Sequence, residues 1–168
     1  LDHGIRSFGY RIVEKDSPGS LLVEKLKGMG IPPGPIYGKI KNQEKVETPE
    51  YGTLFRKDFV GPDQPGKIIT IMGDTKYHES FTPFVQDSDL LVHEATFDAE
   101  QEELAYQYNH STTKQAATLA RDGNVKQLII THISSRYQHA ENEKLLKEAR
   151  EIFPNTILAR DFLHYKIN

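Results

Sequence analysis

Histidine and aspartate side chains follow hydrophobic segments at several points in this sequence, where they could bind a metal ion. Asp74 comes two residues after Met72, and His132 follows a run of leucine and isoleucine. Imidazole nitrogen and carboxylate oxygen both bind zinc, and a catalytic site needs three protein ligands. The chain has no cysteine, which excludes thiolate ligands and favours a hydrolytic site with open positions. His3, Asp74 and His132 are the candidate ligands, although their spacing alone does not show that they converge.

Glu94 and His110 form a second candidate pair. A glutamate is a poor proton donor at neutral pH, but it can orient a histidine and stabilise its charged form. That histidine can then protonate a leaving group. Each residue also has a simpler explanation, because a polar residue after a strand is commonly only a turn, a cap or a hydrogen-bonding partner. Several such residues at one predicted edge favour a shared function.

Three predicted strands place these residues at one edge. Each strand is a short apolar run, and each continues directly into a candidate residue. In α/β folds, ligands bind at the carboxyl ends of the strands. The three runs and the polar residues that follow them are residues 67–72 with Asp74, 89–92 with Glu94, and 127–130 with His132.

The other expected elements are a mixture of strands and helices. Alternating residues predict a strand at 8–13, and Ser17-Pro18 predicts a helix start before Leu26. Thr112 and Gln115 have the spacing of a capping box. Residues 31–35 are expected to be stiff and non-helical, and 36–66 a polar excursion with short strands at best. Further expectations are helices at 112–120 and 143–153 and strands at 156–159 and 163–167.

Composition narrows the class of protein. With 168 residues the chain is one domain or half of a larger one, and no apolar run is long enough to span a membrane. No signal segment opens it, and the lack of cysteine fits a reducing compartment, so a cytoplasmic location is expected. The net charge of -3 argues against indiscriminate nucleic-acid binding. Positive and negative charges are nevertheless separated: 25–45 carries five lysines against one glutamate, whereas 74–110 carries nine acidic residues against Lys76 alone.

The order of the motifs resembles the ribonuclease Z family, the tRNA 3′-processing endonucleases of the metallo-β-lactamase superfamily. The resemblance covers nearly the whole chain, including a glycine- and proline-rich arm that generic superfamily hydrolases lack. It implies an α/β fold, the C-terminal half of a metallo-β-lactamase αββα sandwich. It also implies a start of the half-sandwich at 1–27, a protruding arm at 28–66 and the remainder at 67–168. The motifs are Phe8-Gly9-Tyr10-Arg11, Gly28 to Lys41, Gly73-Asp74-Thr75, His93-Glu94-Ala95-Thr96-Phe97, His110-Ser111-Thr112 and Thr131-His132-Ile133-Ser134 with Arg136-Tyr137.

The resemblance also implies a role for each site residue. His3 is similar to the family's ligand to one zinc, Asp74 to the carboxylate that bridges both zinc ions, and His132 to the ligand of the second. Glu94 and His110 are similar to the pair that assists departure of the leaving group. The arm is similar to the segment that grips the tRNA elbow, with Gly34, Pro35, Lys39 and Lys41 as its candidate tRNA-binding residues.

One departure from the family pattern is large. The main zinc motif, His-x-His-x-Asp-His, is absent and is expected upstream of Leu1. The chain is therefore expected to be the C-terminal part of a homodimeric, zinc-dependent endoribonuclease that removes 3′ trailers from precursor tRNA and leaves a 3′-hydroxyl. Its N-terminal half is expected as a partner, and the isolated fragment is expected to be inactive.

Two alternatives remain open at this point. The first is another phosphodiesterase of the superfamily with a small substrate, which would cleave a chromogenic diester but not precursor tRNA. The second is a non-catalytic RNA-binding or subunit-pairing fragment, which would need no metal.

Overall fold

The computed structural model describes residues 1–167 and divides the chain into two compact units. The first unit combines Leu1–Val13 with the chain from Lys67 onward, and the second comprises Glu14–Gly66. The second unit thus begins before residue 28, the expected start of the arm. None of the helices among the described residues is long and apolar enough to cross a membrane.

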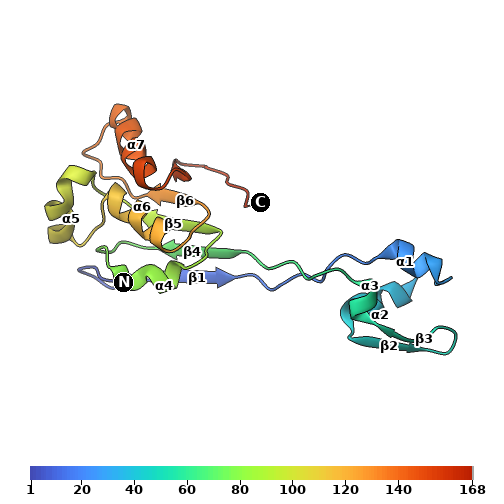
Figure 1. Cartoon of the computed structure of the whole chain (residues 1–168). Coiled ribbons are helices and arrows are strands. Elements are labelled where there is room, and N and C mark those ends of the chain that lie inside the picture. Colours follow the sequence, from blue (N-terminus) through green and yellow to red (C-terminus); the bar gives the residue numbers. More distant parts are fainter. Residues whose placement is uncertain (168) are drawn as a thin grey trace. The chain divides into compact units, whose positions relative to one another are not determined.

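The first unit is built on a five-stranded mixed sheet with the order β1-β4-β5-β6-β7 (Figure 1). β1 is antiparallel to β4, and the remaining neighbours are parallel. The strands expected at 8–13, 67–72, 89–92, 127–130 and 156–159 are confirmed to within two residues. Their bounds are β1 Gly9–Val13, β4 Ile68–Met72, β5 Leu90–Glu94, β6 Leu128–Thr131 and β7 Thr156–Leu158.

Helices cover one face of this sheet. α6 packs against β5 and β6 and buries Leu119 completely. The expected capping box is confirmed, because the Gln115 amide donates to Thr112 Oγ1 at 3.2 Å and the Thr112 amide donates to Gln115 Oε1 at 2.9 Å. The helices of the unit are α4 Thr82–Val85, α5 Glu102–Tyr108, α6 Thr113–Asp122 and α7 Asn142–Ile152, with 3-10 turns η1 Glu79–Phe81, η2 Ala99–Gln101 and η3 His139–Glu141.

The opposite face of the sheet is apolar and open near β1. Tyr10 pairs with Ile71, and Ile12 pairs with Ile69, so their side chains share this face. Tyr10 is 61% exposed, Ile12 52% and Ile71 38%. Such a row of large apolar side chains is typical of a surface that another part of a protein covers.

The second unit has its own small core. A hairpin of β2 Lys45–Thr48 and β3 Gly52–Phe55 accompanies three helices, α1 Val23–Gly28, α2 Pro35–Asn42 and α3 Arg56–Phe59. The buried residues of this core are Leu26, Ile31, Ile40, Val46, Leu54, Phe59 and Val60.

Three sequence-based expectations about local structure were wrong. The helix expected at Ser17 begins only at Val23, because Ser17 pairs with Gln64 and keeps the preceding chain extended. The excursion at 36–66 contains two helices, and Pro35 starts α2 because its fixed φ and missing N–H suit the first helical position. Residues 163–167 form no strand.

Candidate functional site

The sheet topology explains how distant residues reach one edge. Asp74 follows β4, Glu94 is the last residue of β5, and His132 follows β6, and these three parallel strands end on the same side. β1 is antiparallel, and its first residue Gly9 pairs with Met72 at the end of β4. The segment before β1, which carries His3, therefore joins the sheet at this same edge.

The structure brings all five predicted site residues together. Ligand atoms of His3, Asp74 and His110 lie within 4.8 Å of one another, and those of Glu94, His110 and His132 form a second such group. His132 Nε2 lies 3.6 Å from Asp74 Oδ2. The rings of His3 and His110 are 4.8 Å apart, and those of His110 and His132 are stacked at 5.2 Å. Neither group in the described part of the chain contains His3, Asp74 and His132 together.

A buried carboxylate organises the site. Glu94 is 1% exposed. Its Oε1 accepts from the amides of Thr75 at 3.1 Å and Ser111 at 2.9 Å, and from His110 Nδ1 at 3.0 Å. Its Oε2 accepts from the amide of Thr96 at 3.0 Å and from the Thr96 hydroxyl at 2.8 Å. These bonds tie three loops at the sheet edge to one side chain.

The hydrogen bonds of the three histidines fix their tautomers. His3 Nδ1 lies 2.7 Å from the Asn109 carbonyl oxygen, and His110 Nδ1 lies 3.0 Å from Glu94. Both partners can only accept, so these Nδ1 atoms carry hydrogen. The Thr96 hydroxyl donates to Glu94 and therefore accepts from His132 Nδ1 at 2.9 Å. In the neutral rings, all three Nε2 atoms are then free lone pairs.

This donor set fits zinc. Zinc binds neutral imidazole nitrogen and carboxylate oxygen, and a metal-binding histidine usually donates its other ring N–H to an oxygen. His3, His110 and His132 all satisfy that second condition, and Asp74 supplies the carboxylate. The residues present can therefore hold a metal ion without rearranging their hydrogen bonds.

Backbone geometry marks two positions at the site. His132 has φ 57° and Asn109 has φ 60°, both in the left-handed region. Asn109 ends α5 there, a conformation that asparagine adopts readily. Non-glycine residues are uncommon in this region, although histidine adopts it more often than most, and such conformations concentrate at functional sites.

The supporting residues Thr96 and Asn109 were missed by the sequence reasoning. Each of them is hydrogen-bonded to the Nδ1 atom of a histidine. Thr96 lies two residues after the end of β5, where a small hydroxyl residue beside Glu94 was the available signal. The role of Asn109 had no such signal, because it acts through its backbone oxygen.

A buried histidine and a rim aspartate complete the local electrostatics. His93 is fully buried on β5, and desolvation lowers its pKa despite a hydrogen bond to the Glu94 carbonyl, so its ring stays neutral. At the exposed rim, His78 Nε2 donates to Asp2 at 2.8 Å, and this bond holds the pKa of the Asp2 carboxyl below its usual value.

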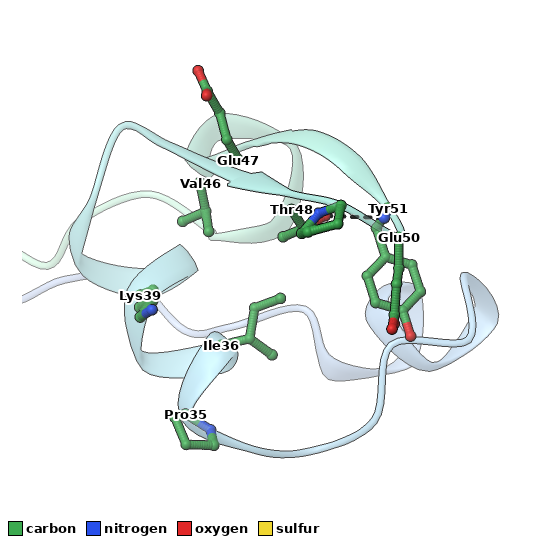
Figure 2. A pocket seen from close by; sticks show the side chains of 9 residues that line it. Pro35, Ile36, Lys39, Val46, Glu47, Thr48, Glu50 and Tyr51 are labelled. Carbon is green, nitrogen blue, oxygen red and sulfur yellow. Dashed lines mark hydrogen bonds between the residues drawn. The ribbon is translucent and has the colours of Figure 1, made fainter.

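The candidate tRNA-binding residues belong to the second unit. Gly34 precedes α2, Pro35 is its first residue, and Lys39 and Lys41 lie in its last turn. A hollow of about 330 Å³ lies between α2 and the β2–β3 hairpin, and Figure 2 shows its lining side chains. Those residues are Pro35, Ile36, Lys39, Val46, Glu47, Thr48, Pro49, Glu50 and Tyr51.

Comparison with known proteins reveals clear relatives. The chain is 56% identical over 167 residues to "Ribonuclease Z" of Bacillus mycoides (strain KBAB4), covering 99% of this chain and 54% of that protein. "Ribonuclease Z" of Oceanobacillus iheyensis is 52% identical over 167 residues, covering 99% of this chain and 55% of that protein. The chain thus spans about half the length of the curated relatives it matches. No protein-family model matches it.

A solved structure supports the fold. The metallo-beta-lactamase fold protein YhfI from Bacillus subtilis matches with a TM-score of 0.51 and 23% identity, covering 69% of this chain and 45% of that one. The expected α/β fold, part of a metallo-β-lactamase sandwich, is confirmed.

Proposed function

We propose that this chain, which belongs to the ribonuclease Z family, is the C-terminal half of a zinc-dependent endoribonuclease that removes 3′ trailers from precursor tRNA. The observation that carries the proposal is the convergence of three histidines, Asp74 and the buried Glu94 at one sheet edge. The match to about half of each relative supports the existence of a longer protein. The open apolar face with Tyr10 and Ile12 is the surface that the N-terminal half would cover.

His3, Asp74 and His132 would hold the metal ions together with ligands from the N-terminal half. When bound, zinc supplies Lewis-acid activation of a water molecule and of the phosphate. The two oxygens of Asp74 suit it to serve two ions. Thr96 and the Asn109 carbonyl keep His132 and His3 in the ligand tautomer.

His110 is assigned a different role because its partner differs. His3 and His132 donate to neutral oxygens, whereas His110 donates to the Glu94 carboxylate. The Glu94 carboxylate fixes the orientation of the His110 ring, so we assign His110 rather than His3 or His132 to proton transfer. It would donate the Nε2 proton to the ribose 3′-oxygen as that oxygen leaves, producing the 3′-hydroxyl on the tRNA.

The second unit would bind the tRNA. Lys39 and Lys41 supply positive charge, and Gly34 and Pro35 shape the start of the helix that carries them. We propose that residues 28–66 act as this tRNA-binding arm and that the longer protein functions as a homodimer in the cytoplasm.

The test uses the full-length protein and a precursor tRNA. The proposal expects zinc in the protein, cleavage at the trailer junction and a 3′-hydroxyl on the tRNA product. A His110→Ala variant should keep its zinc and lose about 10²–10⁴-fold in rate, whereas the exposed His164→Ala control should cleave normally. Cleavage of a chromogenic diester without cleavage of precursor tRNA would instead favour the small-substrate phosphodiesterase, and a zinc-free, inactive protein would favour the RNA-binding fragment.

A further inference from the structure

A half-buried lysine and an exposed tyrosine form a pair beside the site. Lys76 Nζ lies 3.9 Å from the centre of the Tyr106 ring, a cation–π distance. Tyr106 is 68% exposed, so most of its surface is open to solvent. An exposed aromatic ring with an ammonium group next to it is a recurring means of holding single-stranded nucleic acid.

Backbone hydrogen bonds attach this pair to the site. Lys76 lies two residues after Asp74, and its amide donates to the Asp2 carbonyl at 2.8 Å. Asp2 in turn is the neighbour of His3 in the sequence. The Tyr106 carbonyl accepts from the Asn109 amide at 3.3 Å, and the Asn109 carbonyl in turn binds His3 Nδ1. Lys76 and Tyr106 are therefore tied by their backbones to the segments that carry His3 and Asn109.

The charge of Lys76 stands out in its surroundings. It is the single cation among nine acidic residues between Asp74 and His110. Among residues 1–167 its ammonium forms no close ion pair with a carboxylate, although its charge adds to the His78 hydrogen bond in lowering the pKa of the Asp2 carboxyl. If the Lys76 side chain only covered the Tyr106 ring, an uncharged side chain would serve as well. A phosphate that approaches this acidic rim, in contrast, requires a cation.

We propose that Lys76 and Tyr106 form a subsite for the nucleotide that flanks the scissile phosphate. Tyr106 stacks on the unpaired base, and the Lys76 ammonium contacts a neighbouring phosphate oxygen. This subsite rests on the proposed endonuclease function and adds to it a means of holding the RNA strand at the reaction centre. The base belongs either to the last nucleotide of the tRNA or to the first nucleotide of the trailer, and both present the same stacking face.

The test compares Tyr106→Leu, Tyr106→Phe and Lys76→Ala in the full-length protein, with Phe162→Leu and Lys147→Ala as exposed controls. Stacking contributes about 5- to 150-fold in affinity per base. Tyr106→Leu should therefore raise KM for precursor tRNA by that factor, with kcat on bis(p-nitrophenyl) phosphate unchanged. Tyr106→Phe should restore KM, and Lys76→Ala should raise KM and weaken its salt dependence. Both controls should match the unmodified protein.

Abasic substrates identify the base. Precursor tRNAs that lack the base on one or the other side of the scissile bond should each be assayed with the unmodified protein and Tyr106→Leu. Removal of the stacked base should abolish the difference between the two proteins, and the side on which this happens names the nucleotide. Three results would overturn the subsite. The effect of Tyr106→Leu on precursor tRNA could be absent, it could equal the effect on the small diester, or it could persist with both abasic substrates. Failure of the unmodified protein to cleave precursor tRNA would instead overturn the proposed function.

Discussion

The carboxylate of Glu94 is the best place to test the site by substitution, because Glu94→Gln changes its hydrogen bonding with almost no change in shape. The carboxylate accepts five hydrogen bonds and donates none. Glutamine replaces one accepting oxygen with an NH₂ group. If that group takes the Oε1 position, it faces the amides of Thr75 and Ser111. If it takes the Oε2 position, it faces the Thr96 amide, and the Thr96 hydroxyl can rotate to accept.

The orientation with the NH₂ group at the Oε2 position is the less costly, and it determines the expected loss of stability. It leaves one buried N–H without an acceptor, which costs about 1–3 kcal/mol. The bonds that remain on Oε1 are then made to a neutral amide oxygen in place of a charged carboxylate. Each such change costs about 1 kcal/mol, although the costs of neighbouring bonds do not simply add. We therefore expect Glu94→Gln to lower the free energy of unfolding by about 2–5 kcal/mol.

Urea unfolding of the full-length protein, with Glu103→Gln as control, measures this loss. Glu103 is exposed on α5, so its variant should stay within about 0.5 kcal/mol of the unmodified protein. A Glu94→Gln variant with an unchanged urea midpoint and unchanged slope would refute the described hydrogen-bond network.

The same variant tests the role of His110. In the favoured orientation the amide oxygen still accepts from His110 Nδ1, but it carries no charge to stabilise an imidazolium. We expect zinc content to be retained and cleavage of precursor tRNA to slow by about 10²–10⁴-fold. If Glu94 and His110 act as a unit, the double Glu94→Gln, His110→Ala variant should be little slower than His110→Ala, and multiplicative losses would reject the pairing.

Three further predictions concern other residues. Asp74→Ala should remove zinc and activity together in the full-length protein, and near-normal zinc with full cleavage would contradict its role as a shared ligand. Lys39→Ala with Lys41→Ala should weaken binding of precursor tRNA and reduce its salt slope by roughly 0.9 per lost phosphate contact, while hydrolysis of a small diester is unchanged. Burial raises the pKa of Asp89, but hydrogen bonds led by that from Lys126 outweigh burial, and the net pKa is lowered. In urea unfolding, the unmodified protein should therefore be more stable than Asp89→Asn above about pH 4, and this difference should disappear as the pH falls through the lowered pKa.

The sheet edge could be predicted from the sequence because each strand is a short apolar run that stops at a polar residue. That pattern placed Asp74, Glu94 and His132 correctly at strand ends. His3 could be named as a candidate ligand from its residue type, but its approach to the others could not be predicted, because it depends on the antiparallel pairing of Gly9 with Met72. Antiparallel pairing between segments 55 to 63 residues apart in sequence leaves no local signal.

The second unit was harder to predict because its segments are short. Residues 17–22 have the proline, serine and leucines of a helix start, yet Ser17 pairs with Gln64 and Leu21 pairs with Val60. A Cβ atom on Gly19 would lie 2.1 Å from the Gly61 carbonyl oxygen, so the two backbones are in close contact there. Tertiary contact thus overrode local propensity, which in a six-residue helix is worth too little to resist it.

In the proposed mechanism, the three histidines are given different roles because their hydrogen-bond partners differ. All three have the same residue type, the same tautomer and overlapping ligand groups, so distance alone does not separate a metal ligand from a proton donor. The partner of Nδ1 is a neutral oxygen for His3 and His132 and a carboxylate for His110. Removing one partner should therefore affect one role: a Thr96→Val variant removes the hydroxyl that accepts from His132 Nδ1 and leaves the Glu94 carboxylate on His110. We expect that variant to bind zinc about 10- to 100-fold more weakly, and an unchanged zinc affinity would show that residue position, not the hydrogen-bond partner, decides which histidine binds the metal.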